Sequence, residues 1–446
     1  MEGCALGEHG AQSTTDTVEK TADNPFGLAD KGNVELVWFK GGSPAYLPDA
    51  VDPLFRKKHP DVRIERRSTE RMSQTLQPRF VGGNPPDCVD NSGADSLDVG
   101  VLIQDGQVLD LTALYEAPSL DDPKKTVKET LLPGAYEDTL VDGRPYSLAY
   151  YSRGFGLWYD AHFFEGKGWQ VPDTWSAFLT LCEQIKEAGV IPYGFAGKNT
   201  ADYHSNVLLT SAAKLGGPEI LRAVDNLEPH AWEAAAIKKA AEAWAHVGAT
   251  YSDMSFEGLI HTEVQLRQNQ HKVAFYPSGD WLESEQKAST PKGFRYAMAP
   301  TPSLTSHDKL PAHAIYATFG GGGTFVPAKA RNPAAALEYM RLMYSRTAAR
   351  AFTEASGWLT TVSGVADGVT LPPGTASSQR ALEAAGADNV LVNWKFNTWY
   401  KPLAEELKSA VLDLSFGRAS ADAFAARMQK KADAMKKDVS VKKYRR

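Results

Sequence analysis

Short apolar segments alternate with longer amphipathic ones along most of the chain. Residues 35–39, Glu-Leu-Val-Trp-Phe, predict a buried strand that ends at the Gly and Pro residues of 41–44. Further elements of the same kind follow, namely strands at 62–65 and 87–90 and helices that end near Lys58 and Val81. This alternation predicts an α/β fold with a parallel sheet, in which ligands gather at the carboxyl ends of the strands.

The later part of the chain predicts a second α/β unit. Apolar residues fall at helical spacing in 174–188 and 232–247, and residues 272–276 predict a strand that runs into a Pro-Ser-Gly-Asp-Trp turn. A strand and a flexible turn at 316–326 precede a helix at 333–343. Residues 146–159 are rich in Tyr and Gly and contain no good helix. We therefore expect them to be extended chain that crosses between two lobes.

Composition and charge narrow the class of protein. The chain has 446 residues, of which 43% are hydrophobic, so it is long enough to bury a large core. Its 48 basic and 54 acidic residues leave a formal charge of -6 without an extended basic stripe, and we expect no nucleic-acid partner. No apolar run reaches the length of about 18 residues that a membrane-spanning helix needs.

The first residues suggest a lipid anchor. Gly3-Cys4-Ala5 resembles the end of a bacterial lipobox, although no signal segment precedes it. In that interpretation Cys4 carries the lipid, and residues 1–30 form a disordered polar tether. The alternative is that Met1 is the natural start and Cys4 an ordinary thiol. With Cys88 and Cys182 the chain has three cysteines, so at least one is unpaired.

Four short segments carry a resemblance to a known family. They are Gly82-Gly83-Asn84-Pro85-Pro86-Asp87, Gly156-Leu157-Trp158-Tyr159-Asp160, residues 168–175 (Gly-Trp-Gln-Val-Pro-Asp-Thr-Trp) and Ser278-Gly279-Asp280-Trp281. Their order and spacing resemble the extracellular solute-binding proteins of bacterial carbohydrate ABC transporters, which include the maltose-binding proteins. In 37–42 and 144–155 the chain is most similar to actinobacterial lipoproteins that bind N-acetylglucosamine and short chitooligosaccharides.

The resemblance implies a two-lobed periplasmic-binding-protein fold of type II, with a hinge of three crossing segments. We expect the crossings near 149–150, 298–300 and 345–348. Lobe one then comprises 31–148 plus 300–346, and lobe two 149–299 plus 347–446. The implied protein is a lipid-anchored monomer on the extracellular face of the cytoplasmic membrane. It needs no cofactor or metal, and it delivers its carbohydrate ligand to the ABC permease subunits in the membrane.

A sugar offers apolar C–H faces and a rim of hydroxyls, so its receptor needs aromatic rings together with carboxylate and amide groups. By resemblance, and by their positions at strand ends, helix starts and the first crossing, we select twelve candidate ligand-binding residues. They are Trp281, Asp280, Gly42, Ser43, Asn91, Ser92, Asp95, Tyr151, Tyr203, His204, Trp358 and Trp394.

Each candidate also has an ordinary structural explanation. Trp281, Trp358 and Trp394 fit a core as well as a pocket, and Asp280 could cap the helix that follows it. Gly42 and Ser43 could form a simple turn. The polar residues at 91–95 could form an Asx turn, and Tyr203 and His204 could belong to an ordinary helix start. Sequence alone leaves these alternatives open.

A glycoside hydrolase, a zinc enzyme and a phosphate-binding protein are the alternatives to a sugar receptor. A glycoside hydrolase needs two carboxyl groups about 5–10 Å apart, and nothing in the sequence marks such a pair. The ten histidines lack the spacing of zinc sites, and the Gly320 to Gly323 run lacks the Lys of a P-loop. We therefore expect a binding protein rather than an enzyme. A cello-, malto- or xylo-oligosaccharide is the alternative ligand.

Overall fold

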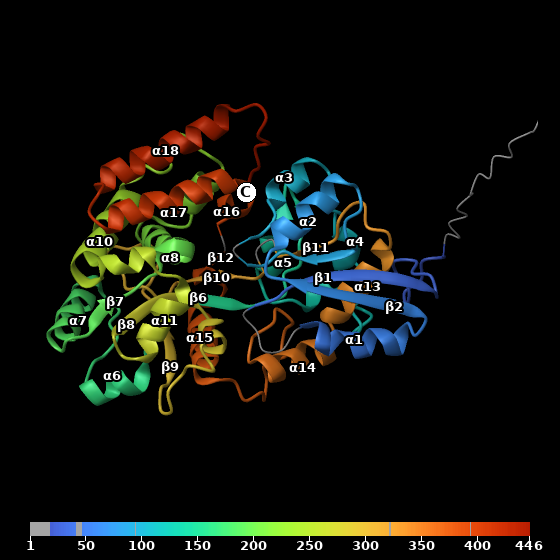
Figure 1. Cartoon of the computed structure of the whole chain (residues 1–446), viewed down its shortest axis with the longest axis horizontal. Coiled ribbons are helices and arrows are strands. Elements are labelled where there is room, and N and C mark those ends of the chain that lie inside the picture. The colour runs from blue at the N-terminus through green and yellow to red at the C-terminus, as the bar shows by residue number, and fades with distance from the viewer. Residues whose placement is uncertain (1–17, 42–46, 94, 321–322, 393) are drawn as a thin grey trace, which may run out of the picture.

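Two lobes form around separate β-sheets (Figure 1). The computed structural model describes residues 18–41, 47–93, 95–320, 323–392 and 394–446. The predicted two-lobed α/β fold is confirmed. Within the described residues, no helix is both long and apolar enough to cross a membrane. Cys88 and Cys182 are buried free thiols, and Cys4 lies outside the described residues.

Lobe one is built on a four-stranded sheet in which β1 is the central parallel strand. In sheet order its strands are β11 (Thr324–Phe325), β3 (Cys88–Asp90), β1 (Gly32–Phe39) and β2 (Val62–Thr69). Val34, Leu36, Val37 and Trp38 are buried on both faces of β1, because helices cover both sides of the sheet. The helices of this lobe are α1 (Leu47–Lys58), α2 (Met72–Val81), α3 (Val99–Gln104), α4 (Thr112–Tyr115), α5 (Ala135–Asp138), α13 (Pro333–Met343) and α14 (Arg346–Ser356).

Lobe two is built on a mixed sheet in which β6 is the central strand. In sheet order its strands are β12 (Val390–Val392), β10 (Ile315–Thr318), β6 (Arg153–Asp160), β8 (Val273–Gly279) and β7 (Ile191–Tyr193), with β9 (Tyr296–Ala299) paired to β6. Every residue of β8 is buried. Around the sheet lie α6 (Ala161–Lys167), α7 (Trp175–Glu187), α8 (Gly197–Gly216), α9 (Glu219–Asp225), α10 (Ala235–Tyr251), α11 (His261–Asn269), α12 (Leu282–Glu285), α15 (Pro373–Ala385), α16 (Phe396–Trp399), α17 (Lys401–Ser415) and α18 (Ala421–Lys437).

Minor elements complete the architecture. A small hairpin joins β4 (Leu140–Val141) to β5 (Arg144–Pro145). Short 3-10 helices occur at Lys128–Thr130, Met254–Gly258 and Ala387–Asn389. None of these elements contributes to the two main sheets.

The chain crosses between the lobes in three segments that lie side by side. The first crossing, at 148–153, is hydrogen bonded to the segment 359–361 that follows α14. Thr361 N donates to Tyr150 O (2.8 Å), and Ser152 N donates to Leu359 O (3.1 Å). The second crossing joins β10 to β11 and contains Gly320, which has φ 124°. A Cβ on Gly320 would lie 2.7 Å from the carbonyl oxygen of Leu148, so only glycine fits there.

The strand pairing differs from the expected lobe boundaries. Residues 296–299 form β9, which pairs with β6 and so lies within the second sheet rather than between the lobes. β10 also belongs to the second sheet. In contrast, α14 packs on α1 of lobe one, and α15 contacts β9. An apolar strand followed by a proline has the same pattern whether it crosses or stays, which is why the sequence placed these crossings wrongly.

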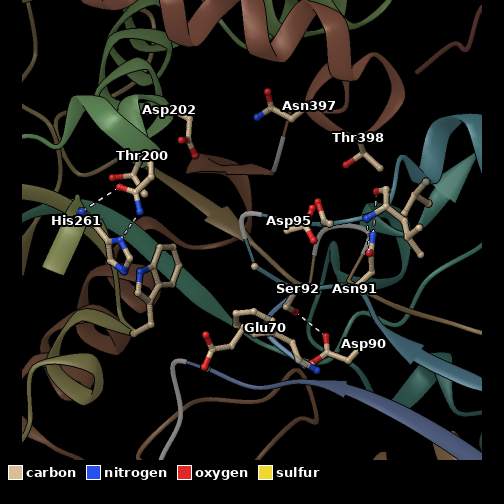
Figure 2. A pocket seen from close by; sticks show the side chains of 18 of the residues that line it. Glu70, Asp90, Asn91, Ser92, Asp95, Thr200, Asp202, His261, Asn397 and Thr398 are labelled. Atoms are coloured by element: carbon tan, nitrogen blue, oxygen red, sulfur yellow. Dashed lines mark hydrogen bonds between the residues drawn. The ribbon is translucent and has the colours of Figure 1, made fainter. Parts of the chain in front are cut away.

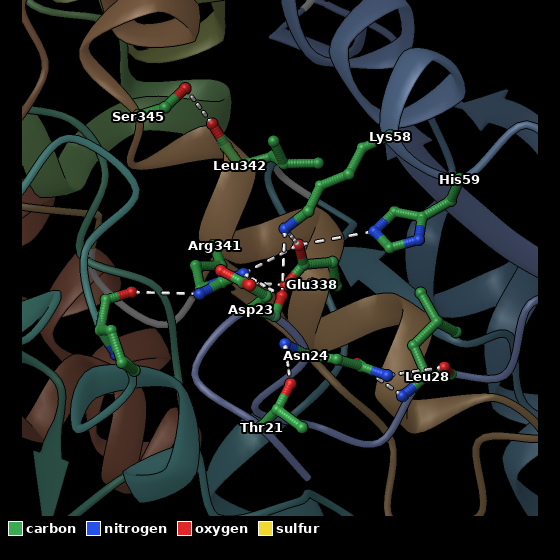
Figure 3. Close-up of polar contacts among 11 residues, drawn as sticks. Thr21, Asp23, Asn24, Leu28, Lys58, His59, Glu338, Arg341, Leu342 and Ser345 are labelled. Carbon is green, nitrogen blue, oxygen red and sulfur yellow. Dashed lines mark hydrogen bonds and ion pairs between the residues drawn. The ribbon is translucent and has the colours of Figure 1, made fainter. Parts of the chain in front are cut away.

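The segment at 18–30 is not a free tether. Phe26 and Leu28 are buried, and the Asn24 side chain holds the turn through two hydrogen bonds to the Leu28 backbone, of 2.8 and 2.9 Å. Figure 3 shows the side chains of Lys58 and Arg341 converging on the Asp23 carbonyl oxygen. Phe26 and Leu28 supply the apolar contacts that a disordered tether would lack.

Glu338 pairs with the same two cations that contact the Asp23 carbonyl oxygen (Figure 3). Its carboxylate accepts hydrogen bonds from Lys58 (2.6 Å) and Arg341 (2.8 Å), and His59 lies at 3.5 Å. Burial alone would raise the pKa of Glu338, but the neighbouring His59, Arg341 and Lys58 side chains lower this pKa to about 2. Glu338 therefore stays ionised and paired with Lys58 and Arg341 across the physiological pH range.

The C-terminal segment bridges the two lobes. Its Tyr444 hydroxyl donates to Gly100 O of α3 (2.7 Å), while Tyr444 N donates to the Tyr400 hydroxyl of lobe two (2.9 Å). Lys442 N donates to the Gln104 side chain of lobe one (2.8 Å). Residues far apart in sequence thus add a contact between the lobes besides the three crossings (Figure 1).

A buried ion pair joins the lobes beside this segment. Lys395 donates to the Asp138 carboxylate, and the side chains are 8% and 1% exposed. The other carboxylate oxygen of Asp138 accepts from Phe319 N of the second crossing (3.1 Å). One carboxylate therefore links α5, a crossing segment and lobe two.

Replacing Lys395 with Met should destabilise the protein strongly, by about 3–5 kcal/mol in the free energy of unfolding, because the Asp138 charge stays buried without its cation. Urea denaturation measures the loss. The matched control is Lys128→Met, which removes the partner of Glu116 at a solvent-exposed pair and should leave stability nearly unchanged. Similar small losses for both variants would contradict the proposed importance of this ion pair.

Candidate ligand-binding cleft

A cavity of about 870 Å³ opens between the lobes. Lobe one lines it with the end of β1 and with the segment that follows β3. Lobe two lines it with the start of α8, the start of α11, the turn between β8 and α12, and helices α16 and α17. The volume lies within the usual range for a small-molecule site. Figure 2 shows side chains of both lobes arranged around its open centre.

Asn91 and Ser92 shape the wall formed by lobe one. The Asn91 amide accepts from Leu97 N (2.7 Å) and donates to Leu97 O (3.1 Å), so it closes the 91–97 loop. Ser92 donates to the Asp90 carboxylate (2.6 Å), whose second oxygen accepts from Phe39 N (3.3 Å). Burial raises the pKa of Asp90 against these hydrogen bonds. These hydrogen bonds hold the side chains of Asn91 and Ser92 in place at the cavity wall.

The wall formed by lobe two is polar where α8 and α11 begin (Figure 2). The Asn199 side chain accepts from His261 N (3.0 Å) and contacts His261 Nδ1 (2.8 Å). Burial lowers the pKa of His261, which favours the neutral imidazole. Asp202 lies nearby, and burial raises the pKa of its carboxyl while the charge of Lys408 opposes that shift.

Aromatic rings meet on the floor of the cavity. Tyr151 and Trp358 are 5.7 Å apart in an edge contact, and Trp281 packs 5.7 Å from Tyr203. Trp358 Nε1 donates to Ser284 Oγ of lobe two (2.9 Å). Gly279 permits the Trp281 position, because a Cβ there would lie 2.0 Å from the indole ring.

Arg153 lies among Tyr151, Trp281 and Trp358, with its guanidinium over each ring.

Glu285 and Asp280 are two further acids beside this floor. Glu285 accepts from the Gln265 amide (3.0 Å), and burial raises the pKa of Glu285 to about 7. Asp280 is 1% exposed, and neither of its carboxyl oxygens has a hydrogen-bond partner among the described residues. Burial raises the pKa of Asp280 to about 7, although the charge of Arg153 acts in the opposite direction.

The structure brings seven of the predicted site residues to the cavity and leaves others away from it. Those that line it are Asn91, Ser92, Asp95, Tyr151, Tyr203, Trp281 and Trp358. Gly42 and Ser43 lie outside the described residues. The contribution of each lining residue to ligand binding stays a prediction.

His204, Trp394 and Asp280 are not among the lining residues. His204 is fully buried, stacks on Phe195 and contacts the Tyr193 hydroxyl (2.9 Å), and burial lowers its pKa to about 3. Trp394 is fully buried and stacks on Tyr316 at 4.1 Å. Both therefore belong to the core of lobe two. Asp280 lies beneath the floor, because its turn directs Trp281 rather than the carboxyl towards the cavity.

Several lining residues were missed by the sequence analysis. His261 and Asn397 come from helix starts that carry no recognisable motif, and Glu285 follows Trp281 by one helical turn. The spacing of Glu285 from Trp281 was the available signal, since residues four apart share a helix face. Within the described residues, no group of three or more His, Cys, Asp or Glu side chains is placed to hold a metal ion.

The sequence profile of the bacterial extracellular solute-binding proteins matches residues 40–350. The chain belongs to this family. It is 32% identical over 433 residues to the diacetylchitobiose binding protein NgcE of Streptomyces coelicolor, which covers 95% of this chain and 89% of that protein.

Solved structures show the same fold. The apo form of RafE from Streptococcus pneumoniae superposes with a TM-score of 0.69 at 18% identity, covering 92% of this chain and 99% of that one. A chitin oligosaccharide binding protein superposes with a TM-score of 0.67 at 19% identity, covering 87% and 94%. At such identities the superpositions establish the arrangement of the lobes alone.

Asp280 makes stability depend on pH. The folded protein retains the Asp280 proton up to about pH 7, whereas an unfolded Asp releases it near pH 4. Its contribution to stability is therefore complete below about pH 4 and is lost as pH rises towards 7. Asp280→Asn should consequently gain stability relative to the wild type between about pH 5 and pH 8, by roughly 1–3 kcal/mol.

Urea denaturation at the two pH values measures this difference. Asp388→Asn makes the same change at an exposed position and should show no such gain. A pH profile of Asp280→Asn that runs parallel to that of the wild type would show that the buried carboxyl does not titrate in this window.

Proposed function

We propose that this chain is the substrate-binding protein of a sugar ABC importer, and that it captures diacetylchitobiose or a short chitooligosaccharide between its lobes. The cavity with its aromatic floor carries the proposal. Tyr151, Trp281 and Trp358 supply rings, and Asp95, Asp202 and Glu285 supply carboxyl groups around them. Rings suit the C–H faces of a sugar, and carboxylates suit its hydroxyl rim.

The similarity to NgcE supports the choice of sugar. That relative is named for binding diacetylchitobiose, and it matches this chain over nearly its whole length. A cello-, malto- or xylo-oligosaccharide is the alternative, because pockets on one scaffold change more readily than the scaffold itself.

The proposed mechanism is closure on the ligand. Both lobes contribute to the cavity, so a sugar that contacts both walls stabilises the closed arrangement. The closed lobes then present a surface to the permease subunits in the membrane. In this proposal the protein is a monomer held outside the cytoplasmic membrane by a lipid on Cys4.

Titration calorimetry with diacetylchitobiose, N-acetylglucosamine, cellobiose, maltose and xylobiose tests the proposal. We expect saturable one-to-one binding that is tightest for the acetamido sugars. Preferred binding of another sugar would retain the receptor role and replace the ligand. Absence of binding to any oligosaccharide would contradict a sugar-binding function.

Trp281→Ala should weaken the binding of the preferred sugar by about 1–3 kcal/mol, because the variant loses an aromatic anchor in the cavity. Calorimetry gives the change in Kd, and thermal denaturation checks the fold. Trp169→Ala is the matched control, since Trp169 packs on Phe163 and Phe164 outside the cavity lining. Equal affinities for wild type and Trp281→Ala would remove Trp281 from the binding site.

A further inference from the structure

Arg153 occupies the point where the two lobes and the first crossing meet. It is the first residue of β6, and its backbone pairs with Thr318 of β10. The guanidinium carbon lies 4.1 Å from the ring centre of Trp358 and 4.3 Å from that of Tyr151. A third ring, Trp281, lies at 5.4 Å. The cation is therefore held in place by aromatic faces that come from the first and third crossings and from lobe two.

No hydrogen bond or ion pair joins this guanidinium to another described residue, and its Nε is buried without a partner. Aromatic faces attract the charge, but they do not accept the N–H groups that lie in the guanidinium plane. Arg153 lines the cavity. Its positioned donors are thus available to an acceptor oxygen that enters with a ligand.

The charges around the cavity indicate what kind of oxygen this is. Among the described residues, seven carboxyl groups line it, namely Glu70, Asp90, Asp95, Asp98, Asp202, Glu285 and Glu405, against the four cations Lys40, Arg153, Lys401 and Lys408. An anionic ligand group would meet this excess of acids, which disfavours a carboxylate beside Arg153. The acceptor that suits the position is neutral.

We infer that Arg153 is a specificity-determining residue that donates to the carbonyl oxygen of a ligand acetamido group. The inference rests on the proposed sugar-binding function and deepens it. An amide carbonyl is the strongest neutral acceptor on such a sugar, and the partly exposed ring of Trp281 offers apolar surface for its methyl group. A sugar with a hydroxyl in place of the acetamido group leaves the Arg153 donors poorly paired. Arg153 thereby discriminates acetamido sugars from their hydroxyl counterparts.

The test compares Arg153→Met with the wild type in calorimetric titrations with diacetylchitobiose and cellobiose, which share a β-1,4-linked backbone. We expect the wild type to prefer diacetylchitobiose and Arg153→Met to lose at least about tenfold of that preference. A general loss of packing would weaken the binding of both sugars by the same factor. An unchanged preference in the variant would overturn the inference while leaving the receptor function intact.

A second measurement uses the wild type alone and decides the matter if Arg153→Met does not fold. The de-acetylated disaccharide of glucosamine replaces each acetamido group with an ammonium, which removes the carbonyl and places a cation near Arg153. We expect its affinity to be at least about tenfold below that of diacetylchitobiose. Equal or tighter binding of the glucosamine disaccharide would show that the acidic lining, not Arg153, sets specificity. A wild type that binds no sugar would instead refute the proposed function itself.

Discussion

Close packing of the three crossing segments is the constraint on which the cleft depends. Their backbones hydrogen bond to one another, and Gly320 approaches the first crossing so closely that no side chain fits. This packing fixes Tyr151 and Arg153 on the first crossing and Trp358 at the start of the third, which is the segment 357–372 between α14 and α15. The floor of the cavity is therefore built where the crossing segments meet, between the two lobes.

Two buried acidic side chains away from the cavity are paired with cations, whereas two ionisable side chains beside the cavity are not paired within the described residues. Glu338 is paired with Lys58 and Arg341, and Asp138 is paired with Lys395, so these charges hold segments together. Arg153 and Asp280, in contrast, have no ion pair among the described residues. Unpaired buried polar groups are costly, and of these two only Arg153 lines the cavity, where a ligand could supply the missing partner. This contrast separates structural electrostatics from those that suit recognition.

The sequence predicted much of the fold, because periodicity reports which faces are buried. The helix expected at 333–343 coincides with α13, and the expected strand at 35–39 lies within β1. Lobe boundaries depend instead on pairing between distant strands, so β9 and β10 were placed wrongly. The site was harder still: Trp281 and Trp394 look alike in sequence, yet one lines the cavity and the other stacks on Tyr316 in the core. Burial of an aromatic ring is a tertiary property that local pattern does not report.

We propose that one sugar contacts both lobes at once. Hydrogen–deuterium exchange with and without diacetylchitobiose tests it most directly, because exchange reports local opening segment by segment. We predict slower exchange on both walls together, in residues 95–99 of lobe one and in 199–203 and 281–285 of lobe two. Protection confined to one wall, or a sugar-independent exchange pattern on both, would contradict it.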